Sequence, residues 1–231
     1  MTIKGVLFDF SGTLLRIESP ESWLRAVLHE TGTDVAEEEV ARLAAELSRA
    51  GALPGGSSPD HMPSELAALW EVRDRSADRH RELYTGLARQ VPLPDDALYD
   101  ALYERHMTPA AWEPYPDAAE VLSELRRRGI RTGVVSNIGW DLRPVLRAHG
   151  LDRFVDSYVL SYEHGIQKPD PRLFEIACEE LGLPPTEVLM VGDDRTADGG
   201  ATALGCTYLP VDHVPPPERP NGLRPALASA G

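Results

Sequence analysis

The stretch GVLFDFSGTLL at residues 5–15 joins an apolar run to a polar turn. The run ends in one carboxylate, Asp9, and a Gly-Thr pair at Gly12 and Thr13 turns the chain shortly afterwards. A short, continuous apolar run bounded by turn residues is typical of a strand buried on both faces. We therefore expect Asp9 to lie at the carboxyl end of a buried strand, with Ser11 in the turn that follows it.

The residues after this stretch differ in composition. From residue 16 to residue 110 the chain is rich in Ala, Leu, Glu and Arg, and ESWLRAVLHE (21–30) and AEEEVARLAAELSRA (36–50) have apolar residues at helical spacing. The loop GALPGGSSPDHMP (51–63) separates them from a second helical group at 64–106. We expect an all-helical insertion without strands, which we call the cap segment (residues 16–110).

Helices and strands alternate in the rest of the chain. Strands are predicted at 130–137, 157–161, 188–194 and 207–211, and helices at 116–129, 142–150, 170–182 and 197–205, with Asp117 and Asp170 as helix caps. The proline-rich tail, 214–231, is expected to run over the surface without regular structure. This order predicts an α/β fold: a doubly wound parallel sheet, Rossmann-like, built from residues 1–15 and 111–231.

The composition argues against several classes of partner. The formal net charge of -14 opposes nucleic-acid binding, which needs a basic surface. No stretch approaches the roughly 20 apolar residues of a membrane span, so we expect no membrane contact and a cytoplasmic location. Cys178 and Cys206 have no metal-ligand spacing, and we expect unreactive thiols in a reducing compartment.

In open parallel sheets, ligands bind beyond the carboxyl ends of the strands. Polar residues stand at these positions, directly after the apolar runs. They are Asp9, the pair Ser136 and Asn137, the loop YEHGIQKPD (162–170), and the pair Asp193 and Asp194. The loop contains Lys168, one of only two lysines in the chain. Such a set can hold Mg²⁺ between carboxylates and bind a phosphate group through Lys168 and Ser136.

Four motifs contain these polar residues and follow one another along the chain: FDFSGTLL (8–15), VVSN (134–137), SYEHGIQKPDPRLF (161–174) and VGDDRTADGGATALGC (191–206). With them the chain resembles the haloacid dehalogenase-like hydrolases, in the form with a helical cap inserted after the first strand. The resemblance implies that Asp9 is a nucleophile that forms a covalent aspartyl intermediate. It also implies a Mg²⁺ cofactor and a small phosphorylated substrate.

The resemblance assigns roles to the remaining site residues. Lys168 would neutralise charge on Asp9 and on the transferred group, and Asp198 would orient Lys168 or a metal-bound water. Mg²⁺ would be held by Asp9, Asp193 and the main-chain carbonyl of Ser11. Substrate binding would involve Thr13, Ser136, Asn137 and Lys168, with Thr13 also stabilising the turn after the nucleophile.

Other polar residues of these motifs have structural interpretations. We interpret Asp194 as an acid at a helix start, Asp170 as a helix cap and Glu163 as an anchor of its loop. His164 is interpreted as a surface residue of the same loop. It is also the first candidate for a proton-transfer group in the space near Ser11.

Ser11 departs from the pattern of the phosphatases in this family. They carry an Asp two residues after the nucleophile, which protonates the leaving group and then activates water. A serine hydroxyl is neither an acid nor a base near pH 7, and such proton transfer contributes roughly 10²- to 10⁴-fold to the rate. The loss falls hardest on alkyl phosphates, whose leaving group needs a proton, and least on acyl and aryl phosphates.

Alternatives at position 11 point to other chemistries. Phosphonatase-like members of the family carry a small residue there but need a lysine in the cap for a Schiff base, and the cap segment contains none. Family members that cleave 2-haloacids use no metal, and their halide leaves unaided, so Ser11 is tolerable for dehalogenation, whereas the acid pair Asp193 and Asp194 favours a metal.

The expected function is thus Mg²⁺-dependent hydrolysis of a small phosphorylated molecule by a monomer or homodimer. The cap segment, with Trp23 and Trp70, would close over the site and select the substrate. One alternative is a catalytically impaired protein that binds a phosphate ligand. A 2-haloacid dehalogenase is the other.

Overall fold

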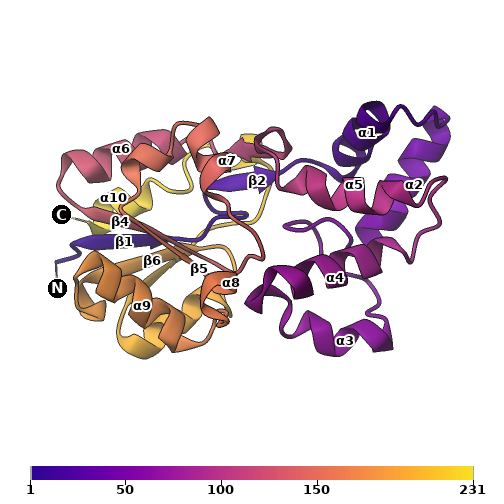
Figure 1. Cartoon of the computed structure of the whole chain (residues 1–231). Coiled ribbons are helices and arrows are strands. Elements are labelled where there is room, and N and C mark those ends of the chain that lie inside the picture. Colours follow the sequence, from indigo (N-terminus) through magenta and orange to yellow (C-terminus); the bar gives the residue numbers. More distant parts are fainter. Residues whose placement is uncertain (1, 231) are drawn as a thin grey trace.

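The structure, a computed structural model, describes residues 2–230 and has a parallel sheet at its centre (Figure 1). The strands are β1 (Gly5–Phe8), β4 (Arg131–Ser136), β5 (Ser157–Leu160), β6 (Val188–Gly192) and β7 (Thr207–Pro210). Their order is β5-β4-β1-β6-β7, so the chain winds to one side of β1 and later to the other. This reversal at β1 is the point at which doubly wound sheets bind ligands, and it confirms the predicted fold class.

Helices cover both faces of the sheet because its strands are apolar on both sides. Val6 and Phe8 of β1 belong to the core cluster that includes Leu122 of α6, whereas Leu7 packs in a second cluster with Phe174 of α9. Figure 1 shows α6 (Ala118–Arg127), α7 (Arg143–Ala148) and α10 (Pro225–Ser229) on one face and α9 (Pro171–Leu181) on the other. The short helix α8 (Ser161–His164) follows β5 directly.

The cap segment lies beyond the carboxyl ends of the strands (Figure 1). Its helices are α1 (Pro20–Thr31), α2 (Glu37–Arg49), α3 (Ser64–Trp70), α4 (Ala77–Ala88) and α5 (Ala97–His106). Ser19 and Ser76 cap α1 and α4 by accepting main-chain N–H groups of the first turn. A 3₁₀ turn, Arg73–Arg75, joins α3 to α4 and faces the sheet.

The expectation of no strand in the cap segment was wrong at its entrance. Leu15–Ile17 forms β2, which pairs antiparallel with β3 (Trp112–Pro114). The chain leaves the sheet through β2 and returns through β3, so the two crossings lie side by side and satisfy each other's backbone groups. Three residues are too few to show a strand period in the sequence.

The helix predicted at 197–205 is a 3₁₀ helix, Asp198–Leu204. It lies close to the loop that carries Lys168, since a Cβ at Gly200 would lie 2.7 Å from the Pro169 carbonyl oxygen. Glycine at this position allows the two backbones to approach.

The prediction for the tail was also wrong. A 3₁₀ turn at Pro216–Glu218 and helix α10 are packed on the molecule, and the side chains of Leu223 and Ala226 are fully buried. Asp117 holds this segment: its Oδ2 accepts the main-chain N–H groups of Leu223 (2.8 Å) and Arg224 (3.2 Å). It therefore makes no side-chain cap on α6, although it stands at the helix start.

No helix within residues 2–230 combines the length and the apolar character needed to cross a bilayer. Both cysteines are free and buried, with their sulfur atoms 4.0 Å apart.

The tail provides a stability test. We expect Asp117→Ala to lower the free energy of unfolding by about 2 kcal/mol, because it removes the acceptor of two N–H groups at a buried site. Glu120→Ala is the matched control: Glu120 also binds the tail, through the exposed Arg224 guanidinium at 2.9 Å, and should cost less than about 0.5 kcal/mol. Urea denaturation measures both, and equal losses would contradict the anchoring role of Asp117.

Candidate active site

The ammonium group of Lys168 joins two carboxylates at the carboxyl end of the sheet. Its Nζ donates to Asp9 Oδ1 at 2.7 Å, to Asp198 Oδ1 at 2.6 Å and to the Val135 carbonyl at 3.0 Å. Asp9 directly follows β1, while Lys168 and Asp198 come from segments more than a hundred residues away in the sequence. The structure thus brings together the three residues that the sequence analysis assigned to catalysis.

Asn137 fixes the backbone of Lys168. Its Oδ1 accepts the Lys168 N–H at 2.7 Å, and its Nδ2 donates to the Lys168 carbonyl at 2.9 Å. The side-chain amide is therefore engaged by protein groups, although Asn137 also borders the cavity beside Ser136. Holding the lysine backbone on both sides directs its side chain at Asp9.

Burial and charge shift the pKa values of this group. Burial raises the pKa of Asp9 to about 8, against the opposing effect of Lys168. Burial disfavours the charged form of Lys168, but the charges of Asp198 and Asp9 outweigh it and raise the pKa of Lys168. A positive charge on Lys168 is therefore retained at neutral pH.

Asp193 lies next to this group and has two partners of its own. Its Oδ1 accepts the Thr13 hydroxyl at 3.2 Å, and its Oδ2 is 2.5 Å from His213 Nδ1. Burial opposes ionisation, but the hydrogen bond and charge of His213 lower the pKa of Asp193 below its usual value. Thr13 is fully buried, so its hydroxyl holds Asp193 and does not reach the cavity wall where a substrate contact was predicted.

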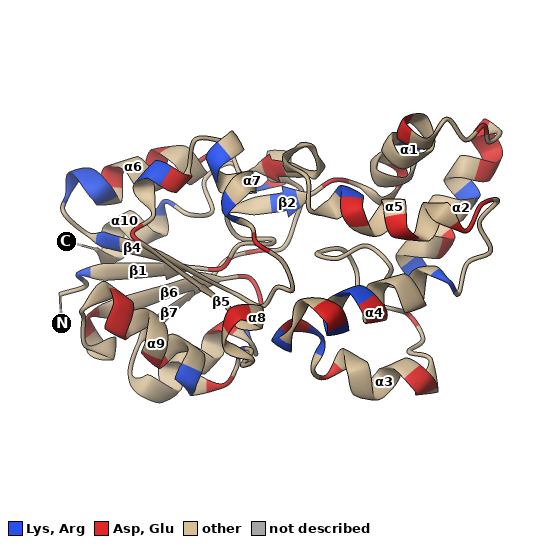
Figure 2. Ribbon diagram, in the orientation of Figure 1, with Lys and Arg blue, Asp and Glu red and all other residues tan. Residues whose placement is uncertain are grey.

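The acidic groups fit a divalent cation by their chemistry. Asp9, Asp193 and Asp198 each offer an oxygen within 4.8 Å of the others, and carboxylate oxygens are the ligands that Mg²⁺ prefers. Figure 2 shows acidic positions in the loops where the sheet faces the cap segment. Both oxygens of Asp198 are engaged, by Lys168 and by the Asp194 N–H, whereas Asp9 uses only Oδ1 for Lys168 and keeps Oδ2 for a ligand. Asp193 and Ser11 lie beside Asp9 on the cavity wall.

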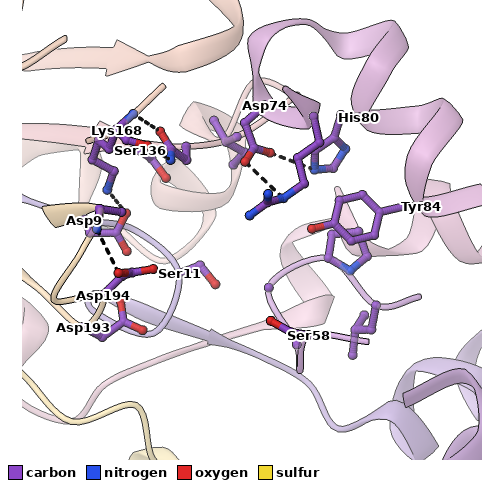
Figure 3. A pocket seen from close by; sticks show the side chains of 18 of the residues that line it. Asp9, Ser11, Ser58, Asp74, His80, Tyr84, Ser136, Lys168, Asp193 and Asp194 are labelled. Atoms are coloured by element: carbon purple, nitrogen blue, oxygen red, sulfur yellow. Dashed lines mark hydrogen bonds and ion pairs between the residues drawn. The ribbon is translucent and has the colours of Figure 1, made fainter. Parts of the chain in front are cut away.

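A cavity of about 210 Å³ separates these residues from the cap segment. Figure 3 shows Asp9, Ser11, Ser136 and Lys168 on the side of the sheet, opposite Asp74, His80 and Tyr84 of the cap segment. The remaining wall includes the loop at 53–58 and the indole rings of Trp70, Trp112 and Trp140. This volume is below the roughly 300–1,000 Å³ of pockets for drug-sized ligands, so the occupant must be a very small molecule.

Two glycines let the cap segment lie directly against the sheet region. A Cβ at Gly55, which has φ +80°, would lie 2.8 Å from Ser11 Oγ, and a Cβ at Gly139 would lie 2.2 Å from His80 Cβ. The loop of the cap segment therefore covers Ser11. In this closed arrangement the cap segment lies directly against the sheet region beside Asp9.

Several other predictions can be checked by contacts. Asp170 caps α9 by accepting the Arg172 N–H, as expected, and Asp194 Oδ1 accepts the N–H groups of Thr196 and Ala197 at the start of the 3₁₀ helix. Glu163 anchors its loop through Arg143 at 2.7 and 2.9 Å. His164 is exposed and does not border the cavity, so it does not fill the space near Ser11.

The sequence analysis missed residues from the tail and from the cap segment. His213 contacts Asp193, and the Arg219 guanidinium donates to the carbonyls of Gly12 (2.7 Å) and Thr13, fixing the turn after Asp9. Asp74 and His80 line the cavity. No motif marks any of these residues, because they come to the site only through the docking of distant segments.

The arrangement of an aspartate after the central strand, a lysine between two carboxylates and a covering helical segment fits a hydrolase with a buried carboxylate in its site. The model of the haloacid dehalogenase-like hydrolases matches residues 3–203. The chain belongs to this family.

Relatives within the family carry out different reactions. The chain is 34% identical to a phosphoserine phosphatase of Thermus thermophilus, over 94% of this chain and 92% of that protein. It is also 34% identical to (S)-2-haloacid dehalogenase 4A of Burkholderia cepacia, over 66% of this chain and 72% of that protein. A solved structure of a phosphatase from Thermococcus onnurineus is similar, with a TM-score of 0.58 and 26% identity, covering 91% of this chain and 86% of that one.

The raised pKa of Asp9 predicts a pH-dependent stability difference. Because the folded protein holds the Asp9 proton more tightly than the unfolded chain, this residue's contribution to stability is lost as the pH rises from about 4 towards about 8. In the presence of a chelator, Asp9→Asn should therefore raise the free energy of unfolding at pH 8.5 by roughly 1–3 kcal/mol, and by less at pH 5.

Urea denaturation at both pH values measures this effect. Asp34→Asn, at an exposed carboxylate of the cap segment, is the control and should show no such trend. A destabilised Asp9→Asn variant at pH 8.5 would contradict the assignment of a raised pKa to Asp9.

Proposed function

We propose that this hydrolase cleaves phosphate esters of small molecules with the help of Mg²⁺, through an aspartyl phosphate on Asp9. The observation that carries the proposal is the contact of Lys168 with both Asp9 and Asp198, next to Asp193 and at the wall of a small cavity. Relatives that match this chain over nine tenths of its length support it, since they are named phosphoserine phosphatase and glyceraldehyde 3-phosphate phosphatase (32% identical, Methanopyrus kandleri).

Each of the side chains at the cavity has its own role in the reaction. Asp9 attacks phosphorus while the bond from phosphorus to the leaving oxygen breaks, and Lys168 offsets the charge that builds up on the transferred group. The Ser136 hydroxyl, at the end of β4, donates to the same group. Water then cleaves the aspartyl phosphate and restores the Asp9 carboxylate.

A bound Mg²⁺ supplies charge neutralisation and orients the phosphate oxygens. Asp9, Asp193 and the main-chain carbonyl of Ser11 would hold it. The cap segment excludes water from the same space by means of the loop over Ser11.

The purified protein should therefore hydrolyse p-nitrophenyl phosphate when Mg²⁺ is present and lose the activity on Asp9→Asn. Ser11→Asp adds an acid at the leaving group and should raise kcat/KM for an alkyl phosphate by less than about tenfold, because a carboxyl group already borders the cavity on the side of the cap segment. The gain is below the full effect of such an acid because the larger side chain must displace the loop at Gly55.

Ser11→Asn separates acidity from size and should produce no gain. A wild type no faster than Asp9→Asn on aryl, acyl and alkyl phosphates would refute the proposal and leave a protein that binds phosphate ligands without turnover. Isothermal titration with inorganic phosphate would detect that activity.

Dehalogenation is a second candidate, favoured by the hydroxyl at Ser11 and by relatives named (S)-2-haloacid dehalogenase at 34% and 31% identity. A halide leaves without a proton, so Ser11 would not slow this reaction. The proposal of phosphate hydrolysis predicts that 2-chloropropionate with a chelator present gives no halide. Release of chloride that Asp9→Asn abolishes would reverse the order of the two candidates.

A further inference from the structure

The wall formed by the cap segment carries a buried carboxylate that the mechanism above does not use. Asp74 lies in the 3₁₀ turn Arg73–Arg75, is 4% exposed and borders the same cavity as Asp9. The turn is fixed to the sheet region, since Ser161 Oγ donates to the Asp74 carbonyl at 2.6 Å. In Figure 3 the Asp74 side chain lies across the open space from Asp9.

The Asp74 carboxyl is buried, and burial raises its pKa above the ordinary value of an aspartate. Arg73 Nε is 3.5 Å and His80 Nε2 is 3.9 Å from its oxygens, and among residues 2–230 no hydrogen bond reaches either of them. Loss of contact with water disfavours the charged form of this carboxyl group, so the shift in the pKa of Asp74 is upward although the charges of Arg73 and Lys168 oppose it.

The other titratable groups of the cap wall are poorer proton donors and acceptors near pH 7. Burial lowers the pKa of His80, whose Nδ1 is 2.8 Å from the Tyr103 hydroxyl, so the ring is neutral. Burial raises the pKa of Tyr84 to about 12. On the opposite side, His213 is engaged by Asp193.

We propose that Asp74 is the general acid and base for the leaving group of the phosphate ester, the function that Ser11 cannot perform. The proposal rests on the function proposed above. Its basis is the position of the only carboxyl group on the described cap wall of the cavity, facing the nucleophile in the closed arrangement. In this arrangement the nucleophile belongs to the sheet region and the acid to the cap segment. An acid at residue 11 would instead lie in the same turn as the nucleophile.

The proton follows a closed cycle. In the first step an Asp9 oxygen bonds to phosphorus, the bond to the leaving oxygen breaks, and that oxygen takes its electron pair and the Asp74 proton to leave as an alcohol. In the second step a water molecule enters where the alcohol left. The water oxygen bonds to phosphorus while Asp74 takes a proton from the water. The bond from Asp9 to phosphorus breaks, and inorganic phosphate leaves with Asp74 protonated again.

The test is the dependence of Asp74→Asn on the leaving group. We expect kcat/KM to fall by about 10²- to 10⁴-fold on an alkyl phosphate such as glycerol 3-phosphate, and by less than about tenfold on p-nitrophenyl phosphate, whose leaving group needs no proton. A merely structural defect would lower both rates equally. Asp78→Asn, at an exposed carboxylate in the first turn of α4, is the matched control and should change neither rate.

A second variant keeps the test independent of folding. Adding Ser11→Asp to Asp74→Asn places an acid beside the nucleophile again and should restore at least tenfold of the lost alkyl phosphatase activity. The inference would be overturned if Asp74→Asn lowered kcat/KM for both esters alike. It would also be overturned if the double variant recovered no activity on the alkyl phosphate.

The result also separates this inference from the proposed function. If the wild type cleaves both esters and only His213→Gln changes their ratio, phosphate hydrolysis stands and the proton is assigned to His213 instead. If the wild type cleaves neither ester, the proposed function and this inference fail together.

Discussion

The contact of Lys168 with Asp9 and Asp198 is the interaction on which the site depends. Two carboxylates buried this close would repel each other, and the ammonium group between them makes their proximity tolerable. Two neighbouring residues support this contact: Asn137 holds the lysine backbone, and Gly200 allows the two loops to meet. The β1 strand supplies the third partner by ending at Asp9.

The contact between the cap segment and the sheet region limits the size of the side chain at position 11. A small residue at position 11 lies under Gly55, and the loop at 53–58 occupies space that a longer side chain would need. The same docking brings Asp74 and His80 to the cavity. Ser11, which replaces an acid in the turn, and the Asp74 carboxyl on the cap wall therefore both lie at the interface between the sheet region and the cap segment.

Much of the fold could be predicted from local patterns. Apolar runs ending in polar residues located β1, β4, β5 and β6, and the caps Asp170 and Asp194 behaved as the sequence indicated. The failures have a shared cause, because the β2–β3 pair, the packed tail and Asp117 all depend on contacts between distant segments. His164 was a poor candidate for the same reason, since nearness to Lys168 in sequence did not bring its side chain to the cavity.

The sequence by itself determined the sheet, the position of Asp9 and the partners of Asp9 at the strand ends, because strand period and strand ends are local properties and parallel strands end at one edge. Only the tertiary structure decided which groups face that edge from outside. Arg219, His213 and Asp74 have no local signature, and their roles arise from where the tail and the cap segment dock. The burial of Asp74 and Arg219, which shifts the pKa values of both groups, exists only in the folded chain.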